Sequence, residues 1–237
     1  DDLNYVTNLN ENLGRGDDSI TQGLYAEKSN DDANATDGNA YWIASNLLAN
    51  KEAYNFQLLA TPGLLSSVHF GVVSDFIAMV EGRADSFYIM DLVGYGGSLN
   101  SPVNQAAKHN TSYAASYWPW LQMASRANGK LVWVPASTLM PGVYAFNDRV
   151  AAEWFAPAGL TRGVINASRA SVQMNRDVLN DLYDADINPI YVPAGRNGEV
   201  YAFGQKTLLQ DPSALDRINV RRLFIVLEKA ISTAAKF

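Results

Sequence analysis

The sequence predicts an α/β domain in which a mixed, largely parallel β-sheet is flanked by helices, preceded by a polar and irregular N-terminal region. Strand-length apolar runs alternate along the chain with segments whose apolar residues recur at helical spacing, which is typical of a sheet with helices on both faces. Two of the runs, residues 86–93 and 131–135, are almost continuously apolar, as buried parallel strands are. With 237 residues, the chain can bury a sizeable core without disulfides.

The chain divides into two parts of different composition. Residues 1–53 are expected to form a variable, loop-rich outer region, and residues 54–237 the α/β domain. Residues 29–38 consist mainly of Asn, Asp and small residues with almost nothing to bury, so they are predicted to form a surface loop. A short helix is predicted at residues 40–51.

The first half of the domain is predicted to alternate strands and helices between clear turn signals. Thr61, Pro62 and Gly63 end the first strand, and Pro119 breaks or kinks the second helix. The predicted elements are a strand at 54–60, a helix at 64–81, a turn at 82–85, a strand at 86–93, a loop at 94–100, a mostly helical segment at 102–126 and a strand at 131–135.

The second half is predicted to end in a long amphipathic helix. Ser137 is a candidate cap for a helix that reaches about Trp154 and is interrupted by Pro141. The elements that follow are a helix at 172–185, a strand at 190–192, a hairpin-like piece at 199–203 and a helix from 214 to the end. In the last helix one face is apolar, through Val220, Leu223, Phe224, Leu227, Ile231 and Ala234.

Composition and charge exclude several classes of protein. The chain has no cysteine, which rules out a disulfide scaffold, a thiolate metal site and a cysteine nucleophile. Its net charge of −6 does not favour a nucleic-acid partner, because phosphate neutralisation dominates that affinity. No apolar run approaches the roughly 20 residues of a membrane span, so no direct membrane insertion is expected.

Candidate chemistry is sparse. His69 and Asp91 are the residues that a Ser-His-acid triad would use, but there is no Gly-x-Ser-x-Gly elbow. The loop at 94–97 follows a strand, yet it lacks the glycine pattern of a dinucleotide site and the Gly-Lys-Ser/Thr of a P-loop. No His-Glu-x-x-His or calcium-loop pattern is present. We therefore assign no catalytic, cofactor-binding or metal-binding residue.

The arginines near the end of the chain are the most suggestive charges. Arg217 and Arg221 are four residues apart and share a helix face, where they repel each other mildly unless anions meet them. With Arg222, they would offer fork-shaped donors to carboxylates on a neighbouring domain or subunit. A solvated face near the sheet explains the same charges equally well.

Four segments, taken in order and spacing, resemble a known family. They are residues 154–163 (WFAPAGLTRG), 187–189 (INP), 204–207 (GQKT) and 216–224 (DRINVRRLF). Together they resemble the tail sheath protein of contractile-tailed bacteriophages. The sheaths of R-type bacteriocins and type VI secretion systems share the pattern more loosely. The clear match covers residues 154–237, a weaker one reaches back to residue 86, and residues 1–60 match nothing.

The resemblance implies a structural protein and not an enzyme. It implies a subtilisin-like sheath domain without protease activity, followed by a tube-proximal C-terminal domain that this chain lacks. Sheath subunits would form stacked hexameric rings around the tail tube, contact baseplate proteins, and contract to drive the tube through the host envelope. The protein would reside in the virion after assembly in the host cytoplasm, and the isolated chain is expected to be monomeric. No cofactor is implied.

The resemblance also gives the arginines a role. Arg162, Arg217, Arg221 and Arg222 become candidate subunit or domain interface residues. Pro157 and Gly159 would make a tight turn, Gly163 would spare a side chain where chains approach, and Arg162 would be free to pair across a contact. The segment from Arg217 to Phe224 would place its apolar residues on the sheet and its arginines outward.

Two other functions remain open from the residues themselves. A hydrolase on the same scaffold predicts that His69, Asp91 and a serine lie within hydrogen-bond reach in one cleft. A receptor- or carbohydrate-binding module, suggested by the 12 Tyr and 5 Trp, predicts an exposed aromatic cluster in a groove.

Overall fold

A computed structural model of the chain describes residues 40–125, 129–193 and 199–235. The surface loop predicted at residues 29–38, like most of the predicted outer region, lies outside these residues. The helix predicted at 40–51 is present as α3 (Ala40–Leu48), and it packs on α4 (Phe70–Arg83).

A six-stranded sheet in the order β1-β2-β3-β8-β9-β6 forms the centre of the domain. Strands β1 (Leu58–Leu65), β2 (Phe87–Asp91), β3 (Ala114–Trp118) and β8 (Asn188–Tyr191) are parallel. Strands β9 (Val200–Ala202) and β6 (Val164–Ile165) continue the sheet antiparallel. The predicted fold class, a mixed and largely parallel sheet flanked by helices, is confirmed.

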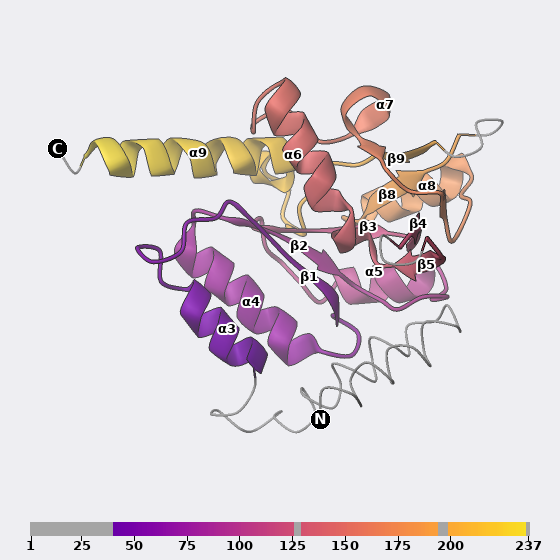
Figure 1. Cartoon of the computed structure of the whole chain (residues 1–237), viewed down its shortest axis with the longest axis horizontal. Helices are drawn as coiled ribbons and strands as arrows, with labels where there is room; N and C mark the ends of the chain where they lie inside the picture. The colour runs from indigo at the N-terminus through magenta and orange to yellow at the C-terminus, as the bar shows by residue number, and fades with distance from the viewer. Residues whose placement is uncertain (1–39, 126–128, 194–198, 236–237) are drawn as a thin grey trace.

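Helices cover both faces of this sheet (Figure 1). Phe87 and Ile89 of β2 point into one hydrophobic core, and Tyr88 and Met90 point into the other. The first core holds α6 (Met140–Val150) and the start of α9 (Ile218–Ala234); the second holds α4, α5 (Asn100–Ala106) and α8 (Arg176–Asp184). The five residues of β2 are all buried, as expected of a central strand covered on both sides.

The helix predicted at residues 102–126 is wrong over most of its length. Only α5 is helical, and the chain then forms β3 and β4 (Leu121–Ala124). Alanine and serine around the aromatic residues of β3 are compatible with a helix, but every residue of this strand is buried in the sheet. Burial between two helical layers therefore decides the conformation over local propensity.

A second sheet of three antiparallel strands, β5-β4-β7, lies beside the first. The strand predicted at 131–135 is present as β5 (Leu131–Val134), but it pairs with β4 and not with the parallel sheet. The third strand, β7 (Arg169–Ala170), pairs with the other edge of β4. This sheet was not expected, because its central strand, β4, comes from the segment predicted to be helical.

Two predicted breaks have other roles. Strand β1 does not end at Thr61 but continues to Leu65, with an irregularity in its pairing after Ala60 and with Gly63 at a φ of 95°, in the left-handed region that glycine favours. Pro141 lies in the first turn of α6, where its missing N–H is harmless, so it begins this helix instead of interrupting it.

Ser137 is not the N-terminal cap that the sequence suggested. It lies in a short 3-10 helix, η1 (Ala136–Thr138), and its side chain bonds to Asp91. The remaining short helices are α7 (Gly159–Arg162) and η2 (Ala214–Asp216). The helix predicted at 172–185 begins later, at Arg176, because Asn175 caps it by accepting the amide of Val178 at 2.9 Å.

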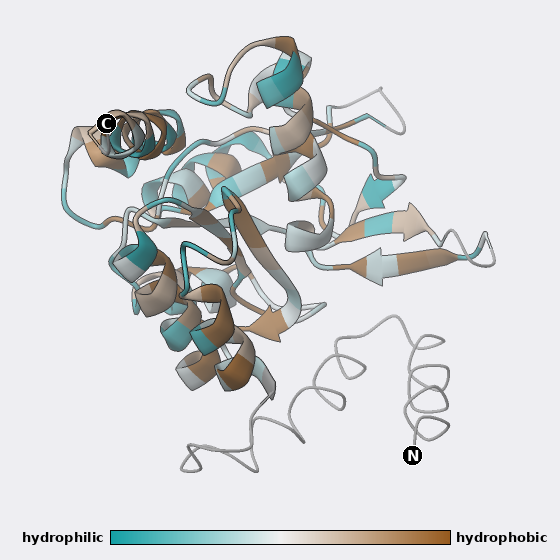
Figure 2. Ribbon diagram, turned by 60° about the vertical axis from the view of Figure 1, so that its left-hand side comes forward, coloured by the Kyte–Doolittle hydropathy of each residue, from teal (hydrophilic) through white to brown (hydrophobic). Residues whose placement is uncertain are grey.

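Helix α9 stands partly away from the body of the domain (Figures 1 and 2). Its buried residues are Ile218, Arg221, Arg222 and Ile225, all in the first half of the helix. The apolar face that was expected to pack on the sheet is largely exposed: Phe224, Leu227 and Ile231 are 44%, 46% and 67% accessible. The predicted orientation of this helix, apolar residues inward and arginines outward, is therefore wrong.

Candidate subunit interface

Arg222 is a buried residue of α9 whose side chain bonds to α6. Its Nη1 and Nη2 donate to the two carboxylate oxygens of Asp148 at 2.8 and 2.5 Å, and its guanidinium lies 5.1 Å from the ring centroid of Tyr144. Tyr144 in turn shares a 2.8 Å hydrogen bond with Tyr117 of β3. Since Arg222 is 3% exposed, this two-pronged ion pair fixes α9 to the domain instead of facing a neighbour.

Arg221, the residue before Arg222 in α9, is also buried. Its Nη2 donates to the Ser112 hydroxyl at 2.5 Å, and its guanidinium lies 4.1 Å over the ring of Tyr113. Both partners precede β3, so this contact ties α9 to the centre of the sheet. Arg221 and Arg222 thus hold the domain together within one chain, which the sequence did not predict.

Arg217 remains accessible at the start of α9. Its Nε pairs with Asp216 at 3.1 Å, its Nη1 donates to the Tyr183 hydroxyl on α8, and its side chain is 38% exposed. An exposed ion pair of this kind contributes little to stability, so the guanidinium is available to a partner.

Arg162 ends α7 and is half-buried. Its Nε donates to the carbonyl of Ala156 at 3.3 Å, and its guanidinium lies 5.1 Å from the ring of Phe155. A side chain on the next residue, Gly163, would come within 2.5 Å of the Ala202 carbonyl on β9. The close approach at Gly163 is within the chain itself, to strand β9, which lies between β8 and β6 in the sheet.

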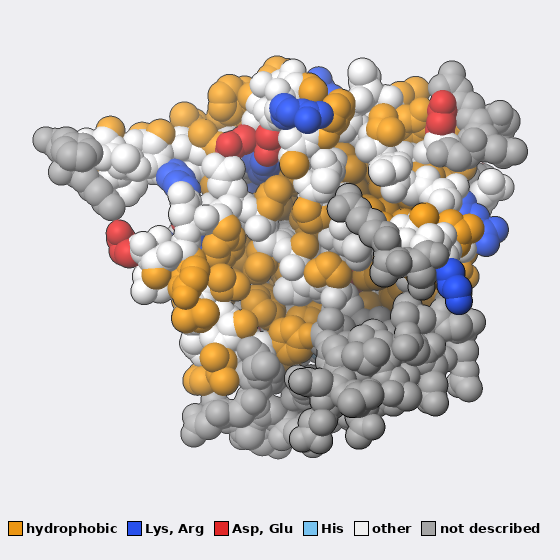
Figure 3. Space-filling model, viewed as in Figure 1, with side chains coloured by type: hydrophobic (Ala, Val, Ile, Leu, Met, Phe, Trp, Pro, Cys, Tyr) orange, Lys and Arg blue, Asp and Glu red, His pale blue; other side chains and the backbone are white. Residues whose placement is uncertain are grey.

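Hydrophobic side chains surround Arg162 on the surface. Basic side chains lie among hydrophobic ones over the end of α6 (Figure 3), and Arg149 lies 5.6 Å from the ring of Phe146 there. We define the α6–α7 patch as the following exposed residues together with Arg149 and Arg162: Phe146, Val150, Trp154, Phe155 and Leu160. Five large apolar side chains close together mark an interaction site more often than scattered surface residues do.

Asn188 explains why two of the family-like segments occur together. Its side-chain amide donates to the carbonyls of Ser116 on β3 and Lys206 at 3.0 and 2.8 Å, and its Oδ1 accepts the amide of Lys206 at 2.6 Å. A side chain at Gly204 would lie 2.7 Å from that oxygen. The INP and GQKT segments are thus two halves of one buried junction.

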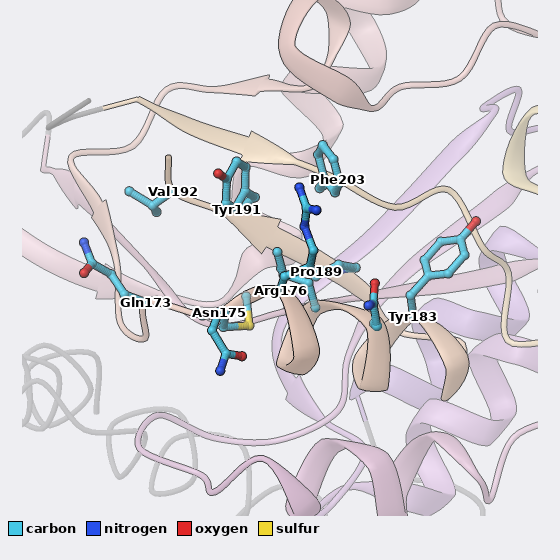
Figure 4. A pocket seen from close by; sticks show the side chains of 11 residues that line it. Gln173, Asn175, Arg176, Tyr183, Pro189, Tyr191, Val192 and Phe203 are labelled. Carbon is cyan, nitrogen blue, oxygen red and sulfur yellow. The ribbon is translucent and has the colours of Figure 1, made fainter. Parts of the chain in front are cut away.

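A pocket of about 670 Å³ lies between α8 and strands β8 and β9 (Figure 4). Its walls are mostly apolar, and the rings of Tyr191 and Phe203 lie 5.4 Å apart in it. Arg176 extends from α8 toward Phe203 (Figure 4). Two aromatic side chains in a pocket are what the binding-module hypothesis expects, although Tyr88, Trp118 and Tyr144 are buried in the cores.

The residues of the hydrolase hypothesis are engaged elsewhere. His69 accepts the amide of Leu65 on its Nδ1 at 3.1 Å, the atom through which a triad histidine donates to its acid. Asp91 is bound to Ser137, whose amide and hydroxyl donate to it at 3.1 and 2.5 Å.

Ser66 and His109 do lie within hydrogen-bond reach of each other, at 2.7 Å. Both are buried, at 1% and 5% exposure, and neither lines the pocket. Burial lowers the pKa of His109, so its ring is neutral near pH 7 and joins the end of β1 to the loop before β3. The geometry favours a structural pair over a nucleophile and its base, which need access to a substrate.

Asp91 gives the domain a pH-dependent stability. Burial raises the pKa of Asp91 to about 7, against the opposing hydrogen bonds from Ser137 and Gly63. The unfolded chain releases this proton near pH 4 and the folded chain near pH 7, so the free energy of unfolding should fall by a few kcal/mol as the pH rises through this window. Urea unfolding at about pH 5 and about pH 8 measures the difference.

Asp91→Asn is the matched control for this prediction. Its amide oxygen still accepts the Ser137 amide and its NH₂ still reaches the Ser137 hydroxyl, so the variant should fold without that pH slope. An unchanged slope in the variant would assign the pH dependence to another group.

The part of the chain that the structure describes lacks the residue groupings of a metal site and the long apolar helix of a membrane span. There, no group of three or more His, Cys, Asp or Glu side chains is placed to hold a metal ion. None of the helices in that part has the length and apolar character to span a membrane. The loop at 94–97 follows β2 as predicted, and the ring of Tyr95 contacts those of Trp120 and Trp133.

Comparison with known proteins identifies relatives by sequence. The chain is 36% identical over 165 residues to the tail sheath protein of Vibrio phage KVP40, and 31% identical over 149 residues to that of Enterobacteria phage T4. These matches cover 68% and 62% of this chain but only 24% and 22% of those proteins, so the chain spans about a quarter of their length. No protein-family profile matches the chain.

Solved structures share the fold. A chain in the baseplate of the anti-feeding prophage matches with a TM-score of 0.65 and 25% identity, over 84% of this chain and 51% of that one. A chain in the contracted helical sheath of the same prophage matches with a TM-score of 0.63 and 25% identity, over 85% of this chain and 52% of that one. The resemblance inferred from the four sequence segments is confirmed.

Proposed function

We propose that this chain forms the α/β domain of a contractile bacteriophage tail sheath subunit. The observation that carries the proposal is the 36% identity with a phage tail sheath protein over 165 residues, joined to a fold shared with a helical sheath. The domain acts as a structural part of the virion, and no enzymatic activity is proposed for it.

The finer assembly follows from the same proposal. Subunits form six-membered rings that stack around a tail tube and attach to a baseplate, and the stack contracts to drive the tube through the host envelope. Residues 1–53 belong to an outer region, residues 54–237 form the body, and a tube-proximal domain completes the subunit. Assembly takes place in the host cytoplasm, and the isolated chain is monomeric.

The rigidity of the domain supports this role. Contraction requires the same subunits to pack in two ways, with the extended array metastable. A subunit that repacks must move as one body, and here helices on both faces of the sheet are joined to it by two hydrophobic cores, while the ion pair of Arg222 with Asp148 joins α9 to α6. The exposed α6–α7 patch and Arg217 supply surfaces for contact between such bodies.

Electron microscopy of the full-length protein tests the proposal. We expect tubular polymers of uniform diameter in negative stain, because a sheath subunit carries complementary contacts that repeat. A protein that stays dispersed at all concentrations and salt conditions, while well folded, would contradict a sheath function.

The accessible arginines provide a variant form of the same test. Arg162→Glu and Arg217→Glu should shorten or abolish the polymers while the melting temperature changes little, because Arg162 bonds to the nearby Ala156 carbonyl and Arg217, whose contacts are Asp216 and the Tyr183 hydroxyl, is 38% exposed. Lys51→Glu, a reversal at an exposed residue beyond α3, is the matched control and should assemble normally. Full-length polymers from both arginine variants would remove these residues from any interface.

A further inference from the structure

One surface of the domain carries exposed apolar side chains with cations among them, and another is a mostly apolar pocket beside carboxylates. The α6–α7 patch carries exposed aromatic and aliphatic side chains with two guanidinium groups among them. The pocket beside α8 is hollow and mostly apolar, and the exposed face of that helix is acidic. The two surfaces share no residue, so both are available on every copy of the chain.

The α6–α7 patch has the composition of an interface centre. Its five apolar side chains are between 37% and 56% exposed, and they include Trp154, Phe155 and Phe146. Arg149 and Arg162 each stack on a phenylalanine of the patch, which holds the guanidinium groups in place at the surface. Aromatic residues and arginine are the side chains that dominate binding energy in protein interfaces.

The pocket has matching properties. At about 670 Å³ it lies within the range of sites that enclose an apolar group, and Met174, Leu179, Pro189, Tyr191 and Phe203 provide its apolar walls. Asp177, Asp181 and Asp184 are exposed on α8, four and three residues apart, so they share the face of the helix next to the one that lines the pocket.

Each of the two surfaces carries charges that can pair with opposite charges on the other. Three carboxylates beside the pocket can face the two guanidinium groups of the patch. Inside the pocket Arg176 extends toward Phe203 (Figure 4), and Glu153 precedes Trp154 in the patch, so a second pair of opposite charges is available when Trp154 enters.

We propose that the α6–α7 patch of one copy docks into the α8 pocket of a neighbouring copy. A contact between two different surfaces is heterologous, and its repetition generates rings or helical arrays instead of closed dimers. This is the symmetry that a helical sheath requires, and a chain of such a sheath shares this fold. The inference rests on the proposed function and names the partner of the surface.

Cross-linking of full-length polymers tests the contact. These 237 residues contain no cysteine, and any cysteine elsewhere in the full-length protein is first replaced by serine. Single cysteines are then placed at exposed polar positions that should not disturb the packing: Thr161→Cys in α7 and Asn180→Cys in the pocket. Polymers grown from a mixture of the two variants are treated with a short bis-maleimide. We expect cross-linked dimers at a yield at least about tenfold above that of a mixture of Lys51→Cys and Asn180→Cys, because docking raises the local concentration of the reacting thiols.

Each other outcome has a defined meaning. Cross-linking of the Thr161→Cys variant with itself, at a yield equal to that of the mixture, would show a symmetric contact and overturn the proposal. Polymers that give no cross-link above the control would overturn it while the sheath function stands. Failure of the unmodified protein to polymerise would instead contradict the sheath function itself.

Discussion

Arg222→Met is expected to lower the free energy of unfolding by about 3 kcal/mol, because it leaves the carboxylate of Asp148 without its partner under α9. Methionine replaces most of the side-chain volume, so the loss comes from the charge and its hydrogen bonds more than from a cavity. The side chains of Arg222 and Asp148 are 4% and 22% exposed, which places the effect at the lower end for a broken buried pair. Urea unfolding followed by tryptophan fluorescence measures it.

Two further variants distinguish the loss of the ion pair from the effect of any substitution in α9. Arg222→Met with Asp148→Leu removes both charges and should recover most of the lost stability, because apolar residues can replace a buried ion pair. Glu228→Met, at an exposed position on the outer half of α9, should change the free energy by about 0.5 kcal/mol or less. If the double variant is as unstable as the sum of its single variants, the charges do not act as a pair.

Asn188→Ala is the second large effect, with an expected loss of about 3 kcal/mol in the free energy of unfolding. The substitution removes three hydrogen bonds at a fully buried position and strands the carbonyls of Ser116 and Lys206. Leaving a buried polar group without a partner costs more free energy than the net contribution of the hydrogen bond it made. Chemical denaturation at a fixed pH gives the difference.

Asn188→Asp sharpens this prediction, since a carboxylate can still accept the Lys206 amide but cannot donate to either carbonyl. It should be more destabilising near pH 7 than near pH 4, where the acid is protonated and one donor returns. Asn175→Ala removes an amide that caps an exposed helix and should lose only about 1 kcal/mol. Equal losses at residues 175 and 188 would contradict the junction described above.

Much of the fold could be predicted from local pattern. A continuous apolar run indicates strand β2, and apolar residues at helical spacing indicate helix α4. Strand β3 could not be found this way, because its alanines and serine suit a helix as well as a strand. What makes it a strand is its place between β2 and β8, and β8 lies some seventy residues further along the chain.

The orientation of α9 shows the limit of amphipathicity arguments. The helical spacing of the apolar residues predicted which face should be buried, but the structure buries Arg221 and Arg222 instead. Their partners, Ser112 and Asp148, are far away in sequence, so nothing near the arginines shows that their charges are met inside. The position of Asp148 on the inner side of α6, next to the apolar Tyr144, is visible only after folding.

The sequence selected some of the residues that form the proposed interface. Arg162 and Arg217 were selected from sequence and are accessible, while the apolar members of the α6–α7 patch and the acidic face of α8 were missed. A signal was present for the patch: Trp154 and Phe155 lie in a loop segment shortly before Pro157, where large aromatic residues have few neighbours to cover them.

Helix α9 has the mechanical properties of a lever. Its buried anchor consists of the guanidinium groups at residues 221 and 222 with Ile225, and further along Lys229 donates an exposed hydrogen bond to Asn55. From Arg222 to Ala234 the helix continues for twelve residues, or about 18 Å. A tilt of about 10° at the anchor therefore displaces the tip by about 3 Å, with no change in the helix itself. A partner bound to the exposed side of α9 would therefore be displaced when the sheet rotates by a small angle. The ion pair of Arg222 with Asp148 lies at the pivot and sets how stiffly the helix follows the sheet.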